Sequence, residues 1–227
     1  MARDFDGTDD YLDMGSDASI DDFGAVTLAC WIRFDTTMTF PRILEKADLA
    51  DLNGWLWLKF TGASNTLYFA RDFATVDGSW RGSTSLNNGT IYHIATTHDG
   101  TTGVATHYIN GVVETLAATV TPSGALVADA ASVLQAGIQN TLVAELDGFM
   151  AHIIYHNAVL TAADINVARW WGRPIGGLKV YHPLFTDKLT NEGSATADAT
   201  ATGTTMLAVA LPVVRPGSAM MGSGVGW

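Results

Sequence analysis

Histidines are the first residues whose spacing could build a metal site. His152 and His156 stand four positions apart, the interval at which two histidines on a helix share one zinc ion. Their segment has the pattern of a strand, in which a rise of about 3.3 Å per residue separates them by about 13 Å. The pattern therefore argues against one shared zinc ion. His93, His98 and His107 fall among further strand signals, where cross-strand packing or a place on the surface is the expected role and a meeting of the three rings is the alternative.

Aromatic residues gather between positions 55 and 80 and could bind a sugar ring or a protein partner. The cluster consists of Trp55, Trp57, Tyr68, Phe73 and Trp80. Trp55 and Trp57 are two positions apart in a strand pattern, so both side chains point to the same face. An exposed face would make Trp55, Trp57 and Trp80 a ligand-binding platform. Packing of these rings in the core is the alternative.

Several other functions are disfavoured by composition and motifs. Cys30 is the single cysteine and lies in an apolar strand pattern, which predicts a buried, inert thiol. The sequence lacks a glycine-rich phosphate loop, a serine nucleophile elbow and a CxxC pair. A net charge of −11 disfavours unaided binding to nucleic acid, because phosphate contacts need clustered Lys and Arg. The sequence shows neither an apolar run that could span a bilayer nor a secretory signal, so we expect synthesis in the cytoplasm without signal-peptide export.

The elements that must position these residues are short strands. Ile91–His98 and Val104–Ile109 have strand patterns and are separated by a turn that starts at Asp99-Gly100. Asn110-Gly111 marks a second tight turn, because both dipeptides tolerate the positive φ angles of hairpin turns. The stretch is therefore typical of a β-meander.

Further strands are expected on both sides of this meander. They are Ala25–Asp35, Arg42–Lys46, Trp55–Phe60, Thr66–Arg71, Ala131–Ile138, Leu146–His156 and Leu178–Phe185. Thr161 can cap a helix that has Asp164 in its first turn and runs to about Trp170. Regular short strands with one short helix predict an all-β antiparallel sandwich of jelly-roll type rather than βαβ units.

Five motifs in the right order resemble the laminin-G-like, concanavalin A-type jelly-roll family. They are Phe5-Asp6-Gly7-Thr8-Asp9-Asp10-Tyr11-Leu12, the segment Leu28–Arg33, the segment Ile43–Lys46, the meander, and the segment from Leu146 to Thr161. The resemblance covers roughly residues 4–170. Leu178–Phe185 resembles a segment that precedes the first strand in many relatives. We therefore expect it to pack near the N-terminal strand, since the termini of compact domains often lie close together.

The resemblance also bears on catalysis. Glycosidases of this fold class carry an E-x-D-x-x-E strand motif whose carboxylates act as nucleophile and general acid. Glu145 and Asp147 match its first two members, but Met150 stands in the place of the second glutamate. A retaining mechanism needs both carboxylates, so no catalytic residue and no enzyme activity are expected.

Relatives often bind calcium through loop carboxylates. The resemblance implies a calcium site with Asp6, Asp9, Asp10 and Asp147 as ligands, because calcium takes six to eight oxygens. Turn aspartates that are merely solvated are the alternative. No other cofactor is expected.

The composition changes near Gly172, which predicts three parts. These are a laminin-G-like sandwich over residues 1–171, an additional strand and loop at 172–205, and an apolar tail at 206–227. Such a tail needs a surface to bind, on its own sandwich or, as we favour, on a neighbouring subunit. The expected contact residues are Met206, Leu207, Leu211, Val213, Met220, Met221 and Trp227.

The leading functional hypothesis is a non-catalytic structural or attachment protein of a larger assembly. Its favoured location is a bacteriophage virion, as capsid decoration or on the tail, with further copies or a capsid or tail protein as partners. The Pro-rich ending from Leu211 to Pro216 resembles structural modules of tailed bacteriophages. The alternative is a carbohydrate-binding module, with or without calcium, whose partner is a glycan.

Overall fold

The computed structural model describes residues 2–48, 53–62, 64–139, 144–171, 178–184, 189, 191–195, 198–208 and 211. The first strands are β1 (Ala2–Asp6), β2 (Tyr11–Asp13), β3 (Ala25–Phe34), β4 (Arg42–Asp48), β5 (Asn53–Phe60), β6 (Thr66–Arg71), β7 (Gly78–Gly82) and β8 (Ile91–Asp99). They are followed by β9 (Val104–Ile109), β10 (Val112–Val113), β11 (Leu116–Val120), β12 (Leu134–Ala136), β13 (Asp147–His156), β14 (Leu178–His182), β15 (Thr200–Thr202) and β16 (Thr205–Leu207). The helices are the 3-10 helix η1 (Ala18–Ile20) and α1 (Ala162–Trp171).

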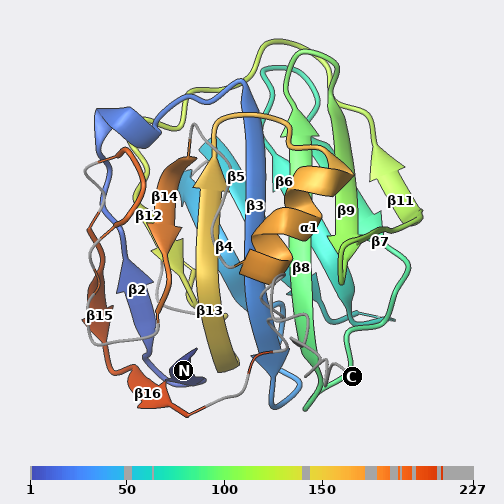
Figure 1. Cartoon of the computed structure of the whole chain (residues 1–227). Coiled ribbons are helices and arrows are strands. Elements are labelled where there is room, and N and C mark those ends of the chain that lie inside the picture. The colour runs from blue at the N-terminus through green and yellow to red at the C-terminus, as the bar shows by residue number, and fades with distance from the viewer. Residues whose placement is uncertain are drawn as a thin grey trace, which may run out of the picture.

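Two antiparallel sheets face each other across the core (Figure 1). Sheet A has the order β10-β9-β8-β3-β13-β1-β16, with β14 also paired to β13. Sheet B has the order β11-β7-β6-β5-β4-β12-β2-β15. This arrangement confirms the predicted all-β sandwich. The first of the five resembling motifs, residues 5–12, spans the end of β1, a turn and the start of β2. Strands β1 and β2 belong to different sheets, so the turn carries the chain from one layer to the other.

Strand β3 shows how alternation builds two packed faces. Val26, Leu28, Cys30, Ile32 and Phe34 lie in the core between the sheets, as the sequence pattern predicts. Burial raises the pKa of the Cys30 thiol, which keeps it protonated and inert. The opposite face of the strand is also covered, because Ala29 packs against helix α1 and Trp31 lies in a second apolar cluster with Phe149.

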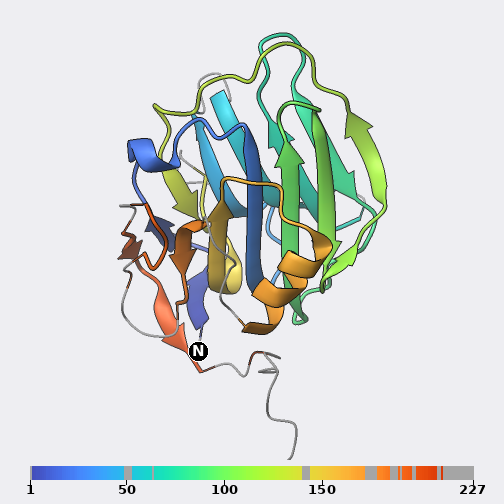
Figure 2. The ribbon, with the colours of Figure 1, turned by 45° about the horizontal axis from the view of Figure 1, so that its top comes forward.

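Helix α1 covers part of the outer face of sheet A (Figure 2). Its side chains Ile165 and Ala168 pack with Ala29, Ala95 and Ile154 of the sheet in one apolar cluster. The helix begins with the predicted cap, in which the Asp164 backbone N–H donates to Thr161 Oγ1 at 3.2 Å. In return, the Thr161 backbone N–H donates to Asp164 Oδ2 at 3.1 Å.

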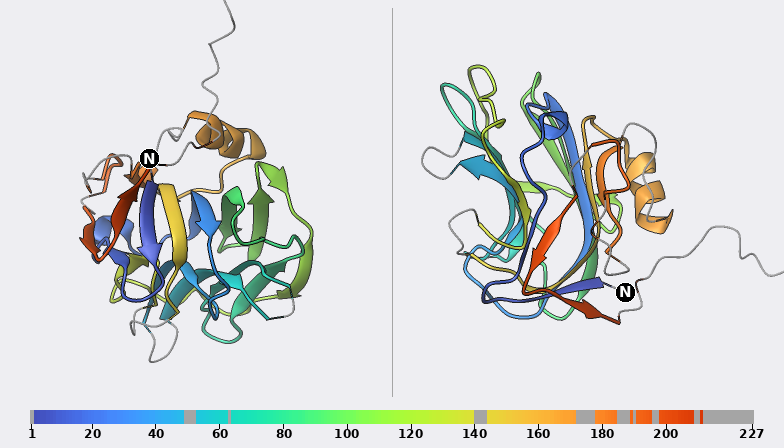
Figure 3. Two further views of the ribbon diagram at one scale, coloured as in Figure 1. Left: turned by 90° about the horizontal axis from the view of Figure 1, so that it is seen from below. Right: turned by 90° about the vertical axis from the view of Figure 1, so that its left-hand side faces the viewer.

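Strand β14 lies on the same edge of β13 as the N-terminal strand β1, at the next part of that edge. Strand β13 pairs with β1 through Asp147–Met150 and with β14 through Ile153–His156, while β3 occupies its other edge. This pairing confirms the prediction for Leu178–His182; Phe185 lies outside the described residues. In the right-hand view of Figure 3 the two layers and the helix outside them are seen from the side.

The described part of the tail packs on its own sandwich. Met206 pairs with Arg3 in the β1–β16 ladder. Leu207 and Leu211 pack against an apolar cluster that contains Trp31 and Phe149 on the outer face of sheet A. These residues therefore contact their own chain, whereas the sequence analysis favoured a neighbouring subunit. The other predicted contacts lie outside the described residues; they are Val213, Met220, Met221 and Trp227.

A candidate ligand-binding face

The tryptophans of the predicted platform are buried. Trp55, Trp57 and Trp80 retain only 1%, 0% and 2% of their surface exposure. Trp55 and Trp57 do share one face of β5, but that face points into the core, and Trp57 Nε1 donates to Thr96 Oγ1 of sheet A at 2.8 Å. The prediction that these three rings form an exposed platform is therefore wrong, and their packing in the core was the correct alternative.

A polar network behind the tryptophans holds the two sheets together. The Thr96 hydroxyl that accepts from Trp57 lies 2.8 Å from Nδ1 of His107, and His107 Nε2 lies 3.0 Å from the carbonyl oxygen of Trp80. A neutral His107 ring with its proton on Nε2 satisfies both contacts. Burial lowers the pKa of His107 to about 4, which favours this neutral form.

The outer face of sheet B carries a different set of aromatic rings. Tyr68 of β6 is directly opposite Leu58 of β5, and Phe60 lies at the end of the same strand. The ring centroids of Phe60 and Tyr68 are 5.6 Å apart, and those of Phe40 and Phe60 are 5.2 Å apart. Phe40 is 36% exposed, while Phe60 and Tyr68 are half-buried. The three rings form an accessible row, which we call the aromatic row.

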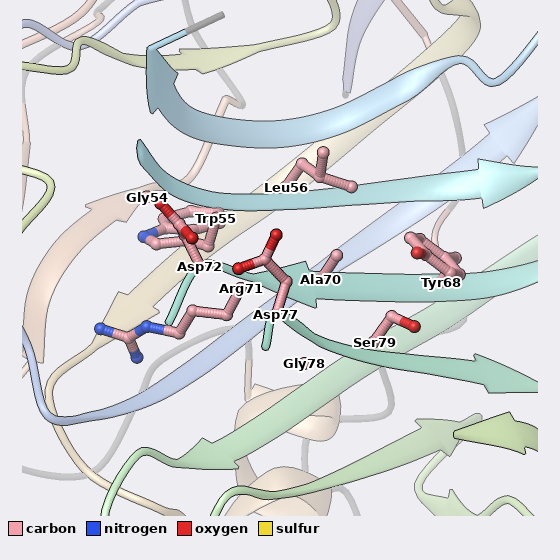
Figure 4. Close-up of a pocket in the computed structure, with 10 residues that line it drawn as sticks. All are labelled: Gly54, Trp55, Leu56, Tyr68, Ala70, Arg71, Asp72, Asp77, Gly78 and Ser79. Atoms are coloured by element: carbon pink, nitrogen blue, oxygen red, sulfur yellow. The ribbon is translucent and has the colours of Figure 1, made fainter. Parts of the chain in front are cut away.

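Two hollows adjoin this row and share Leu56 and Tyr68. The smaller has a volume of about 210 Å³ and is lined by Gly54, Trp55, Leu56, Tyr68, Ala70, Arg71, Asp72, Asp77, Gly78 and Ser79 (Figure 4). The larger has a volume of about 510 Å³ and is lined by Thr39, Phe40, Arg42, Leu56, Leu58, Phe60, Tyr68, Gln139 and Ala144. We call them the polar hollow and the aromatic hollow.

The charged groups are divided unequally between the hollows. Asp72 and Asp77 line the polar hollow together with Ser79. At the aromatic hollow, Arg42 Nε donates to Glu45 Oε2 at 2.6 Å. The guanidinium carbon of Arg81 lies 5.1 Å from the centroid of the Phe60 ring. The aromatic end of the face therefore carries two guanidinium groups and one carboxylate, whereas two carboxylates line the hollow at the other end.

Glycines shape the polar hollow. Gly54 adopts a φ of 129°, and a Cβ added there would lie 2.0 Å from the carbonyl oxygen of Lys46. A Cβ at Gly78 would lie 2.3 Å from the Trp80 ring. Larger residues at these two positions would displace the strands or the tryptophan beneath, so both glycines are needed for the form of the hollow.

Three of the four predicted calcium ligands lie together. Asp6, Asp9 and Asp10 each place a carboxylate oxygen within 4.8 Å of the others. Asp10 is 4% exposed, and burial, followed by repulsion from neighbouring aspartates, raises its pKa. Two of the oxygens are already used, because Asp6 Oδ1 accepts from the Thr8 N–H and Asp10 Oδ2 from the Asp6 N–H. The remaining carboxylate oxygens suit a hard cation such as calcium.

Asp147 is not part of this group. It pairs with Asp6 in the register of β1 and β13, but its Oδ2 accepts from Thr36 Oγ1 at 2.5 Å. Met150, which replaces the second glutamate of the glycosidase motif, is completely buried in the core. The position that a second catalytic carboxylate would need is therefore apolar and inaccessible.

The five histidines considered from the sequence are all buried, and they lie on both sides of sheet A. His98 and His107 lie between the sheets, whereas His93 lies on the outer side of sheet A, where its ring contacts Trp31. His152 and His156 lie on β13, as the strand pattern predicts, and His152 Nδ1 is 2.8 Å from the Tyr181 hydroxyl. Among the described residues, the one group with metal-binding geometry is the aspartate group.

Comparison with known proteins identifies the family of the chain. The family model described as the concanavalin A-like lectin/glucanases superfamily matches residues 6–166, more than half of the chain. The chain belongs to this superfamily. A comparison with curated proteins gave no match.

Several solved structures share the fold at low sequence identity. A protein from Bacteroides ovatus ATCC 8483, thought to bind carbohydrate, has 15% identity and a TM-score of 0.64; the match covers 90% of this chain and 58% of that protein. The SAP-like heptameric pentraxin from Limulus polyphemus has 15% identity and a TM-score of 0.54, with 74% and 80% coverage. The CBM40 of the Ruminococcus gnavus IT-sialidase, bound to α2,3-sialyllactose, has 10% identity and a TM-score of 0.53, with 74% and 97% coverage.

Most residues on the outer face of sheet B were not predicted from the sequence to bind a ligand. Tyr68 was part of the predicted aromatic cluster, but Phe40 and Phe60 were given no role. A signal was present, because Leu56, Leu58 and Phe60 alternate with the buried Trp55 and Trp57 along β5. Within the described residues, no helix is both long and apolar enough to cross a membrane.

Proposed function

We propose that the protein is a non-catalytic carbohydrate-binding module whose ligand lies on the outer face of sheet B. The observation that carries this proposal is the aromatic row of Phe40, Phe60 and Tyr68, which lines the aromatic hollow and meets the polar hollow at Tyr68. Aromatic rings bind the apolar face of a pyranose, while polar groups beside them take its hydroxyl groups. The arrangement supplies both kinds of contact on one accessible surface.

The size of the face suits an oligosaccharide rather than one sugar. The two hollows lie on either side of Leu56 and Tyr68, which contribute to both. A chain of sugars can therefore fill both hollows with Tyr68 beneath its middle. Support also comes from the superfamily, whose description includes lectins, and from the shared fold of the CBM40 bound to sialyllactose.

Substitution of the aromatic row tests the proposal. A glycan array identifies the best ligand, and calorimetry then compares the wild-type protein with Phe60→Ala and Tyr68→Ala. Each substitution should weaken binding about tenfold, which corresponds to about 1.4 kcal/mol. Trp170→Ala on helix α1 is the matched control, because Trp170 is half-buried on the side of sheet A. Unchanged affinity in both aromatic variants, or equal loss in the control, would remove the basis of the proposal.

The hypothesis of a bacteriophage virion protein gains no support from these comparisons. Glycan binding therefore replaces it as the main proposal. A location in a virion, and contacts with other subunits through residues 206–227, stay separate predictions. They are compatible with glycan binding, since an attachment protein can bind sugars of a host.

A further inference from the structure

We propose that the polar hollow selects a sugar that bears a protonated amine, and that it rejects sugars that bear a carboxylate. This inference rests on the proposed function, because it assigns a ligand class to the same face. It concerns the charge of the hollow, which the shared fold does not determine. The related CBM40 is bound to sialyllactose, an acidic glycan, so the two ligand classes are opposed.

The polar hollow is lined by negatively charged groups. Asp72 and Asp77 both line it, beside the hydroxyl groups of Ser79 and Tyr68 (Figure 4). Asp77 is exposed, and one of its oxygens, Oδ1, accepts from the Phe73 N–H at 3.0 Å. This hydrogen bond fixes the carboxylate at the rim of the hollow, where it can meet a ligand.

Arg71 is the one cationic side chain among the residues that line the polar hollow, and it points away from the hollow. Arg71 Nη2 donates to the carbonyl oxygen of Phe23, and Arg71 Nη1 lies 3.3 Å from Nδ1 of the buried His98. Figure 4 shows its guanidinium on the far side from Tyr68 and Ser79. Arg71 is 3% exposed, so its charge is directed into the protein and does not neutralise the hollow.

The positions of the charged groups determine which way the ligand lies along the outer face of sheet B. Arg42 is paired with Glu45, and Arg81 lies over the Phe60 ring, so both cations belong to the aromatic end of the face. A ligand amine placed there would face two guanidinium groups. The same amine in the polar hollow faces two carboxylates, and the apolar side of the next sugar then lies on the aromatic row. The net charge of −11 further attracts a cationic glycan over a longer range.

Three defined probes test the inference on the full-length protein. They are an oligomer of glucosamine, the N-acetylated oligomer of the same length, and sialyllactose, measured by calorimetry at pH 6 and low salt. The amine-bearing oligomer should bind at least fivefold more tightly than its acetylated form, and sialyllactose should bind most weakly. Added salt should reduce the preference for the amine, because the carboxylates are solvent-exposed.

Asp77→Asn tests the assigned residue, since the amide keeps the shape and removes the charge. It should reduce the preference for the amine, since Asp72 keeps its charge, while leaving affinity for the acetylated oligomer within about twofold. Glu192→Gln is the control, because it removes one exposed negative charge near β14 of sheet A. Equal or reversed preference in the wild-type protein, or a preference of unchanged size in Asp77→Asn, would overturn the inference alone. Failure of every glycan to bind the wild-type protein would instead overturn the proposed function as well.

Discussion

Individual residues place charge in positions that sequence alone does not reveal. Lys46 is completely buried, and its Nζ lies 2.8 Å from Asp129 Oδ1 and 2.9 Å from Asp21 Oδ1. The same ammonium group donates to the Asp129 carbonyl oxygen at 2.5 Å. An internal cation thus joins the loops around residues 21 and 129 at one end of the sandwich. A buried charge of this kind is tolerated because it is paired and hydrogen-bonded.

The aspartate group near the N-terminus gives a prediction at the residue scale. Calcium should raise the melting temperature relative to EDTA, because a cation would relieve the repulsion among Asp6, Asp9 and Asp10. At a calcium concentration 100 times Kd, the stabilisation is about 2.7 kcal/mol, which corresponds to several degrees. Differential scanning calorimetry measures the shift.

Asp9→Asn should remove most of the effect of calcium, since Asp9 is exposed and contributes an oxygen to the group. Asp198→Asn is a control with the same loss of charge at an exposed position. Identical melting temperatures with calcium and with EDTA would mean that these aspartates are merely solvated.

Elements rather than single residues decide which surfaces remain open. Helix α1 packs over Ala29 on the outer face of sheet A, and Leu207 of the edge strand β16 packs with Leu211 against Trp31 and Phe149 of the same face. The outer face of sheet B keeps its hollows. Prediction from sequence found α1 with its cap, the strands β6 and β9 with their observed bounds, and most of the other long strands. It missed β7, β10, β11, β15 and β16, because strands of this length carry little hydrophobic alternation.

The contact of the tail with sheet A gives a prediction at the scale of the element. Leu207→Ser should lower the free energy of unfolding by about 1–3 kcal/mol, because Leu207 packs with Leu211 near Trp31. Urea unfolding, followed by tryptophan fluorescence, measures the change. Ala208→Ser, at the adjacent exposed position, is the control. A loss of stability in neither variant, together with loss of self-association in Leu207→Ser, would favour the neighbouring subunit instead.

All six histidines of this acidic chain are buried in the folded protein. Burial lowers the pKa of His93 and of His98 to about 3, with Arg169 and Arg71 respectively as the next largest causes. With His107 at about 4, three imidazoles stay neutral in the folded protein at pH values where the unfolded chain protonates them. The folded state therefore binds fewer protons than the unfolded state below about pH 6.5.

Stability should consequently fall as the pH is lowered from about 6.5 towards 4, and should change little from these groups above about pH 7.5. Each histidine contributes about 1.4 kcal/mol per pH unit in that range. Asp10 and Glu114 oppose the trend at lower pH, because burial raises their pKa values. Urea unfolding at several pH values measures the slope, which His107→Gln should reduce by about a third. A constant or rising stability below pH 6.5 would contradict the prediction.

The sequence by itself determined the class of fold, the positions of most long strands and the fact that Trp55 and Trp57 share one face. It also showed that the glycosidase motif is broken at Met150. The tertiary structure alone decided that the tryptophans point inward. Alternation divides a strand into two faces but does not state which face meets the other sheet. Because one face of each strand meets the other sheet, Phe60 and Tyr68 point outward from neighbouring strands. Phe40 lies beside them, and only the folded chain brings residues 40, 60 and 68 together.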